Sequence, residues 1–242
     1  MSRANVKDKR KAQLIAAALD SIARRGLLET TITHISKGAG MSRGIINFYF
    51  TSKEMMLRET LKTLIDEYEA EWGEALTKAG DDGRARLDAL VAAHFSKKLC
   101  SARRLNVMSA FWGHAATQAA YRNQLEAADL KIETAFTAAL AHTLDSSLEE
   151  SKHSATQLHA LVRGLWLTFM LNPQDANREA LATEVLSFID RLLGAPVRIV
   201  ANNAPLREPE TPKLVVQKPK PKAKPKAEPQ QMDIEDLFGK MN

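Results

Sequence analysis

The residues with the most evident chemistry lie in a short basic stretch near the start of the chain. Ser42 can cap a helix or reach a phosphate, and Arg43 after it can pair with O6 and N7 of guanine. Asn47 follows Arg43 by about one helical turn, so it shares a face where its amide can read adenine. Tyr49 and Lys53 can bond backbone phosphates. These types at this spacing predict a helix that reads DNA.

A second group of residues has the chemistry to hold a small cation. Aromatic faces with a nearby carboxylate bind a quaternary ammonium well. The chain beyond residue 60 supplies both, in Phe111, Trp112, Tyr121, Trp166, Phe169, Glu126 and Asp129. The same aromatic residues lie on apolar stripes at helical spacing, which is also typical of core packing. Ligand contact and core packing therefore both stay open.

No cluster in the sequence predicts catalysis, a cofactor or a metal site. The histidines are scattered, and His153 and His159 are six positions apart, whereas a spacing of four would place two ligands on one helix face. Cys100 has Arg103 and Arg104 nearby, which would suit a redox-sensing thiol, but a partly buried structural cysteine is the simpler interpretation. We therefore expect a protein that is not an enzyme.

The elements that position these residues are predicted to be helices throughout. The first proline is Pro173, and apolar residues recur at helical spacing up to about residue 194. This predicts an all-α fold of about nine helices with no strand. Short helices over 31–39 and 42–50 flank Gly40, which can adopt the positive φ of a sharp turn. That is a helix-turn-helix pattern, although a small three-helix core without DNA contacts is the alternative.

A long helix is expected to open at Lys53 with an apolar stripe that runs to Leu76, and the next helix carries Leu87 to Leu99, with a loop at 80–83 between them. The later helices are expected over about 103–116, 117–144, 147–172 and 175–193. The helix over 147–172 is apolar on nearly every side, so we expect the core or a partner chain to bury it all round. Gly44, in the second short helix, permits close approach to DNA or to the helix before it.

The charge of the chain is unevenly distributed. The net charge of +5 divides into +6 for residues 1–60, −4 for 61–195 and +3 for 196–242. This favours a DNA-binding domain over 1–52, a helical effector-binding and dimerisation domain over 53–194, and a disordered tail over 195–242. A single cysteine, a charged start without an apolar core and no apolar run of about 18 residues predict a cytoplasmic protein that does not contact a membrane.

Residues 10–60 resemble the TetR family of bacterial repressors. The matching positions are Gly26, Thr31, Ile32, Ile35, Ala39, Gly40, Ser42, Gly44, Tyr49, Phe50, Lys53 and Glu54. The resemblance implies a homodimer whose two recognition helices enter successive major grooves of a double-stranded operator. It implies phosphate contacts at Thr33, Ser42, Tyr49 and Lys53, and base contacts at Arg43, Asn47 and Phe48. The family commonly has Tyr in place of Asn47, so its operator sequence does not carry over.

Beyond residue 60 the chain is similar to one subfamily, the choline-responsive betaine-operon repressors called BetI. The similarity rests on 110–112, Tyr121, Arg122 and 164–167. It implies a repressor released by a small-molecule effector, choline or a related quaternary amine. It also implies that the last two helices form a four-helix bundle with the partner, through Leu161, Leu165, Leu181, Val185, Phe188, Ile189 and Leu192. Internal burial of these residues is the alternative.

The tail is not explained by the resemblance. Alternating Lys and Pro over 218–226 predict an extended linker, which either solubilises the protein or binds DNA non-specifically. Ile234, Leu237, Phe238 and Met241 have the spacing of a helix that folds in a partner protein's groove, although a disordered end is the alternative. A competing hypothesis for the whole chain is therefore a nucleoid-associated architectural or adaptor protein without an effector.

Overall fold

The structure is a computed structural model that describes residues 3–174 and 176–196. The Lys/Pro segment and the motif at Ile234, Leu237, Phe238 and Met241 lie outside the described residues. Within them the regular structure is nine α-helices and no strand: α1 (Arg3–Glu29), α2 (Ile32–Ala39), α3 (Arg43–Tyr49), α4 (Lys53–Ala79), α5 (Gly83–His94), α6 (Ala102–Ala115), α7 (Ala119–Leu144), α8 (Leu148–Leu171) and α9 (Arg178–Leu192). The all-α prediction is confirmed for this part of the chain.

Side-chain caps determine where most of these helices begin. Thr31, Ser42 and Ser52 each accept a hydrogen bond from a backbone N–H in the first turn of α2, α3 and α4. Ser147 and Glu150 form a reciprocal capping box at the beginning of α8. Each cap satisfies backbone donors that have no partner inside the helix. Local sequence therefore fixes these boundaries without help from the core.

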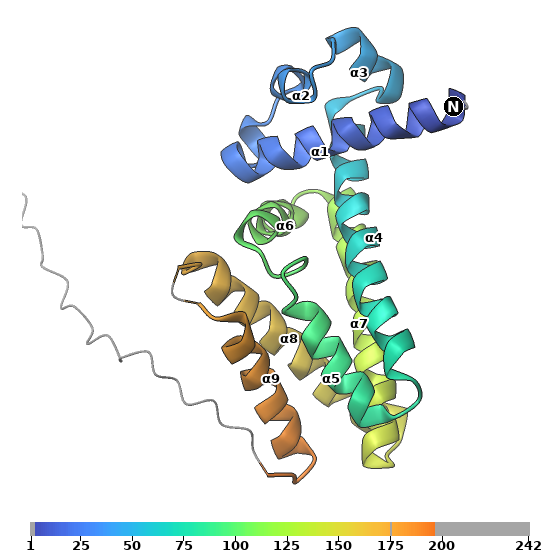
Figure 1. Cartoon of the computed structure of the whole chain (residues 1–242), viewed down its shortest axis with the longest axis vertical. Helices are drawn as coiled ribbons and strands as arrows, with labels where there is room; N and C mark the ends of the chain where they lie inside the picture. Colours follow the sequence, from blue (N-terminus) through green and yellow to red (C-terminus); the bar gives the residue numbers. More distant parts are fainter. Residues whose placement is uncertain (1–2, 175, 197–242) are drawn as a thin grey trace, which may run out of the picture. The chain divides into compact units, whose positions relative to one another are not determined.

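Helices α1, α2 and α3 pack around one small core (Figure 1). Gly26, with φ of 79°, interrupts α1 near its end, and Gly40, with φ of 62°, ends α2 in the left-handed conformation. The core holds Leu14, Ile15, Ala17, Ala18, Ile35, Ala39, Ile46, Phe50 and Met56. Met56 belongs to α4, so the predicted domain boundary between residues 52 and 53 is not a break in packing.

Residues along α4 contribute to three successive hydrophobic cores. Met56 lies in the first core, and Leu61 and Leu64 lie in a second that α1, α6 and α7 share. Tyr68 and Trp72, further along α4, pack against a third. The 27 residues of α4 span roughly 40 Å at about 1.5 Å per residue. One rigid helix therefore connects the α1–α3 group to the rest of the described chain.

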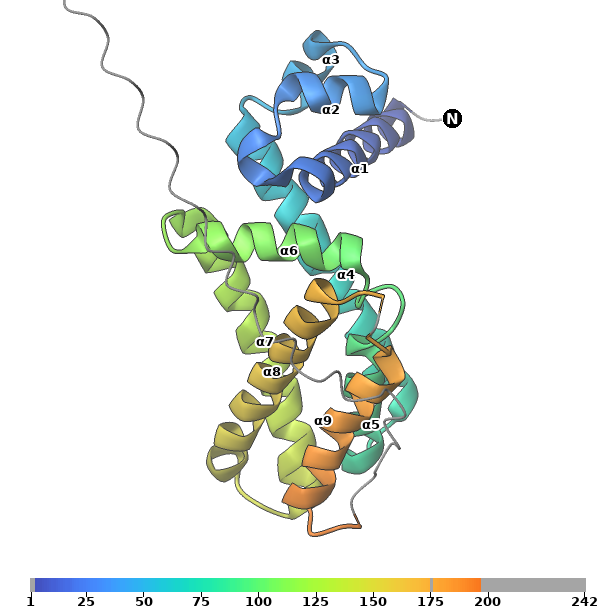
Figure 2. The same cartoon turned by 90° about the vertical axis from the view of Figure 1, so that its left-hand side faces the viewer.

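Helices α5, α7, α8 and α9 form the third and largest core, and α6 lies across its upper end (Figure 2). Helix α6 also packs against α1, α7 and α8. The core covers only one side of α8, because Leu167 is 48% exposed and Leu171 is 66% exposed. Of the two expected ways of burying α8 all round, the core alone therefore does not suffice, and burial by a partner chain stays a prediction.

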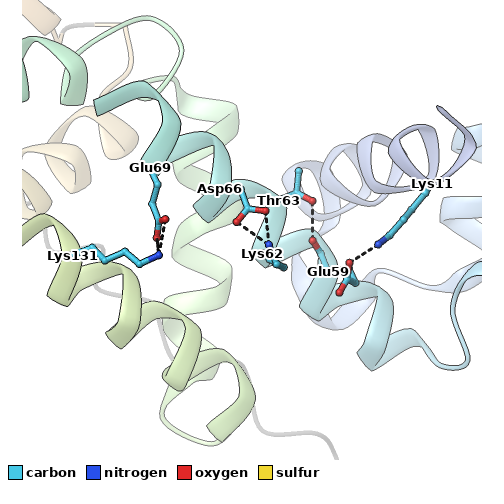
Figure 3. A network of polar contacts seen from close by, with 7 residues as sticks. All are labelled: Lys11, Glu59, Lys62, Thr63, Asp66, Glu69 and Lys131. Atoms are coloured by element: carbon cyan, nitrogen blue, oxygen red, sulfur yellow. Dashed lines mark hydrogen bonds and ion pairs between the residues drawn. The ribbon is translucent and has the colours of Figure 1, made fainter. Parts of the chain in front are cut away.

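Ion pairs join α4 to the helices on either side of it (Figure 3). Lys11 Nζ of α1 lies 2.7 Å from Glu59 Oε2, and Lys131 Nζ of α7 lies 2.7 Å from Glu69 Oε2. Between them Lys62 pairs with Asp66 along α4 itself. These pairs supplement the apolar contacts that hold α4 in place. Among the described residues, no helix combines the length and apolar character that a membrane span requires.

Candidate DNA interface and effector cavity

Most of the predicted DNA-contacting residues lie on or next to α3, whereas Thr33 lies in α2 and Lys53 in α4. Ile46 of α3 is fully buried in the first core, which fixes how that helix is rotated. The exposed positions are Ser42, Arg43, Gly44, Asn47 and Phe48, while Tyr49 and Lys53 are half-buried. Phe48 is 74% exposed, so its ring is accessible to an outside molecule.

The two cationic side chains among these residues, Arg43 and Lys53, each donate a hydrogen bond to a residue of α2 or α1. The Arg43 guanidinium donates a hydrogen bond to the hydroxyl of Thr33, which is itself a predicted phosphate contact. Lys53 Nζ lies 3.3 Å from the carbonyl oxygen of Leu28 in α1. Both interactions are with exposed partners and are easily exchanged for contacts with DNA.

Gly44 was expected to permit close approach either to DNA or to α2, and its surroundings test the second of these reasons. A Cβ atom at this position would meet only Ser42 Oγ, at 3.8 Å, which is ordinary van der Waals contact. Packing against α2 therefore does not require a glycine. Close approach to an outside molecule is the remaining reason.

Arg10 is a basic residue beside this surface that the sequence reasoning did not single out. It lines a shallow hollow next to α3 together with Ser42, Gly44, Phe48 and Tyr49. Arg10 is exposed and belongs to α1. The basic residues among 7–11 were the available signal, but the distance of Arg10 from α3 in the sequence concealed its proximity to that helix.

A cavity in the body of the molecule brings together part of the predicted effector site. Helices α4, α6, α7 and α8 contribute most of its walls. The lining residues are Ile65, Tyr68, Leu99, Arg104, Leu105, Met108, Trp112, Leu125, Ala128, Asp129, His159, Arg163 and Trp166. Of the seven predicted ligand residues, Trp112, Trp166 and Asp129 are therefore together at one place.

The other four predicted ligand residues lie elsewhere. Phe111 and Tyr121 pack edge to face in the second core with ring centroids 5.2 Å apart. Phe169 packs in the third core under the guanidinium of Arg178, and Glu126 is exposed on α7. None of the four lines the cavity, and the three rings occupy the core-packing positions that the sequence left open as the alternative.

Three of the charged or titratable groups of the cavity form a compact network, while Arg104 pairs separately with Glu67. Arg163 Nη2 lies 3.0 Å from Asp129 Oδ2, and the guanidinium carbon of Arg163 lies 5.4 Å from the centroid of the Trp112 ring. His159 lies 3.8 Å from Asp129 through Nε2 and 3.2 Å from Glu133 through Nδ1. Burial raises the pKa of Asp129 above its ordinary value, and Arg163 and then His159 oppose that shift.

A second polar network joins the lining residues Tyr68 and Trp166 to His94 behind them. Nδ1 of His94 lies 2.6 Å from the carbonyl oxygen of Leu90 and so carries a proton, which leaves Nε2 to accept the hydrogen bond from Tyr68, at 2.8 Å. The indole N–H of Trp166 donates to the His94 carbonyl oxygen at 3.0 Å. Burial lowers the pKa of His94 to about 4 and raises that of Tyr68. The ring of Trp166 is thus a fixed wall.

The cavity is small. Its volume is about 30 Å³, room for about two water molecules. Any larger ligand must therefore move side chains as it enters. The sequence reasoning missed Tyr68, His159 and Arg163, because which charged residues of α7 and α8 face one another depends on helix packing.

The predicted dimerisation residues divide into two groups. Val185 and Ile189 are fully buried among the core residues of the same chain, so they cannot also contact a partner. That part of the prediction is corrected to internal packing. The remaining five are only half-buried, and they are Leu161, Leu165, Leu181, Phe188 and Leu192. They lie on α8 and α9, as the exposed Leu167 and Leu171 of α8 do.

Cys100 is fully buried, and burial raises the pKa of its thiol to about 11. This environment is that of an inert structural cysteine rather than a redox sensor. No group of His, Cys, Asp and Glu side chains within the described ranges could hold a metal ion.

Two segments of the chain match known protein families. Residues 14–60 match the family described as bacterial regulatory proteins, tetR family, and residues 83–194 match the BetI-type transcriptional repressor C-terminal domain. The HTH-type transcriptional regulator BetI of Burkholderia mallei is 30% identical over 197 residues, which are 81% of this chain and 100% of the relative. BetI of Burkholderia ambifaria is 29% identical over 195 residues, with the same shares of both chains.

Solved structures of regulators have the same fold. A transcriptional regulator from Pseudomonas aeruginosa PAO1 gives a TM-score of 0.69 at 26% identity, over 77% of this chain and 91% of that one. One from Rhodococcus sp. Rha1 gives 0.67 at 29% identity, over 78% and 99%. A regulator from Saccharomonospora viridis, solved in complex with choline, gives 0.61 at 22% identity, over 76% and 96%.

Proposed function

Because the chain belongs to the TetR family of bacterial transcriptional regulators, with a C-terminal domain of the BetI type, we propose that it is a homodimeric repressor released from its operator by a small molecule. One observation carries the proposal: the exposed side of α3 presents Arg43, Gly44, Asn47 and Phe48 while Ile46 is buried. A surface of this composition on a second short helix suits the major groove.

Two substitutions test the placement of α3. Replacing Arg43 with Ala should cost about 1–3 kcal/mol of operator affinity and relax specificity at one base pair. Replacing Lys53 with Ala should weaken binding to all duplexes alike and reduce the salt dependence of the affinity. The probe is a duplex selected from random DNA by the full chain, and affinities are measured by gel shift at several salt concentrations. Unchanged retention of the duplex by both variants would contradict the placement.

The dimer is proposed to form through α8 and α9. The half-buried residues Leu161, Leu165, Leu181, Phe188 and Leu192 supply apolar surface that one chain does not cover. Exposed Leu167 and Leu171 on α8 extend that surface. Two copies would bury these leucines, and the resulting pair of α3 helices would match a near-palindromic operator.

The effector is proposed to be choline or a related quaternary amine that binds in the cavity between α4, α6, α7 and α8. Trp112, Trp166 and Asp129 supply the aromatic faces and the carboxylate that such a cation prefers. Similarity to BetI regulators supports this choice, and the S. viridis complex is an instance of choline bound to a protein of this fold.

Choline titration tests this part separately. We expect millimolar choline to change the intrinsic tryptophan fluorescence and to release the selected duplex from the wild-type chain. No change in either signal would contradict the choline proposal and leave the DNA-binding proposal intact. Fluorescence change without release would place choline in the chain but not in control of DNA binding.

A further inference from the structure

A cation of the chain itself already occupies the position that suits a ligand cation. The Arg163 guanidinium carbon is 5.4 Å from the centroid of the Trp112 ring, and Arg163 Nη2 is 3.0 Å from Asp129 Oδ2. An aromatic face and a carboxylate are the two partners that a quaternary ammonium requires. In this structure both are engaged by one side chain.

We propose that Arg163 is an internal competitor of the effector: a cationic ligand binds by displacing its guanidinium from Trp112 and Asp129, so Arg163 sets the affinity for the ligand. The inference rests on the proposed function, because it assumes a cationic effector. It adds a specificity-determining residue that the sequence reasoning did not name.

The size of the cavity favours displacement over simple addition. Space for about two water molecules does not admit a trimethylammonium group beside the existing side chains. Trp166 is held by its hydrogen bond to the His94 carbonyl oxygen, so that wall is fixed. Of the two arginines that line the cavity, Arg163 is the one that can leave, because its side chain is 36% exposed and its long stem lets the guanidinium turn into water, whereas Arg104 is 12% exposed and pairs with Glu67.

The groups left behind would then need a new cation. Asp129 would keep His159 at 3.8 Å, a distance beyond a good hydrogen bond, and the face of Trp112 would lose its cation. The ligand therefore gains only the excess of its own contacts over those of Arg163. Removing the charge of Arg163 should abolish this competition and leave both partners available.

The experiment measures choline binding to the full chain by isothermal titration calorimetry. Arg163→Met keeps an unbranched apolar stem and removes the charge, and Arg163→Lys keeps the charge. We expect Arg163→Met to bind choline about tenfold more tightly than wild type, equivalent to about 1.4 kcal/mol. Arg163→Lys should stay closer to wild type. Asp129→Asn should bind choline at least about tenfold more weakly.

Arg191 provides a matched control. Its guanidinium carbon lies 6.0 Å from the centroid of the Phe188 ring, so it is also an arginine over an aromatic face, but it does not line the cavity. Arg191→Met changes the net charge by the same amount and should leave choline affinity unchanged. An equal gain in both methionine variants would attribute the effect to net charge and overturn the inference.

A measurement on the wild-type chain does not depend on a variant that folds. In protein labelled with ¹⁵N-arginine, the Nε–H signal of Arg163 should become that of a mobile, solvent-exposed side chain when choline saturates the cavity. Choline binding with an unchanged Arg163 signal would overturn the inference, and so would weaker choline binding by Arg163→Met. Tighter binding by Arg163→Met without release of the duplex would uphold the inference while contradicting release by an effector.

Discussion

Gly44 is the residue at which stability and DNA binding should respond in opposite directions. A Cβ there meets only Ser42 Oγ at 3.8 Å, so alanine fits the free chain. Gly44→Ala should raise the free energy of unfolding by roughly 0.5–1 kcal/mol, because alanine is the better helix residue. It should also weaken operator binding about tenfold, the scale of a single lost base contact. Urea unfolding and gel shift measure the two effects.

Gly113 in α6 gives the control for that prediction, because a Cβ there also meets nothing within 4 Å. Gly113→Ala should raise stability without a change in operator affinity. Normal operator binding by Gly44→Ala would mean that this residue does not approach DNA closely.

His94 should make the stability of the protein depend on pH. Burial lowers its pKa from 6.5 to about 4, so between these values the unfolded chain binds a proton that the folded chain does not. The free energy of unfolding should therefore fall as pH decreases from about 6.5 towards 4. In His94→Gln the decline should be shallower, even if the variant is less stable at pH 7. Urea unfolding at pH 7, 6 and 5 compares the slopes, and equal slopes would refute the assignment.

At the residue scale, side-chain chemistry could be predicted better than side-chain neighbours. Trp112, Trp166 and Asp129 line one cavity as expected from their types. Phe111 and Tyr121 have the same types but lie in another core, because rotation of α6 and α7 about their axes decides which rings meet. The spacing of residues in one sequence does not reveal how far each helix is rotated about its axis.

At the element scale, helix boundaries with a local cause were predictable. Ser42 acts as a cap where expected, and Gly40 has the positive φ that the turn requires. Gly83 differs: the sequence favoured a loop at 80–83, but Gly83 is the first residue of α5. The helix begins there because the Asp82 side chain caps it by accepting a hydrogen bond from the Ala85 N–H, and the residue is a glycine because α5 approaches α7 closely.

Substitution of Gly83 should measure how tight that approach is. A Cβ would lie 2.5 Å from Thr143 Oγ1, 2.8 Å from His142 Nδ1 and 2.9 Å from the Ala139 carbonyl oxygen. Gly83→Ala should therefore lower the free energy of unfolding by about 1–3 kcal/mol, as overpacking of a core does. Gly73→Ala in α4, where a Cβ meets nothing within 4 Å, should not destabilise the chain. Similar melting temperatures for both variants would rule out the close contact.

At the scale of the whole molecule, the proposed dimer predicts that folding and DNA binding can be separated. Leu165 and Phe188 are half-buried on α8 and α9, so Leu165→Glu with Phe188→Glu should give a folded monomer. That monomer should bind the selected duplex far more weakly, because one α3 helix reads only half of the operator. Light scattering and circular dichroism measure size and helicity. A dimer with normal operator affinity would exclude this interface.

The ion pairs along α4 have a consequence for how salt acts on the protein. Lys11 of α1 forms an ion pair with Glu59 of α4, and both side chains are partly exposed. Salt therefore screens this pair as well as the contacts between the protein and DNA phosphates. Ionic strength would then act at two places: on the counterions of the duplex, and on the ion pair between α1 and α4 that helps to orient α3. Operator affinity should fall with salt more steeply than the number of phosphate contacts accounts for. Part of that slope would be a property of the protein alone.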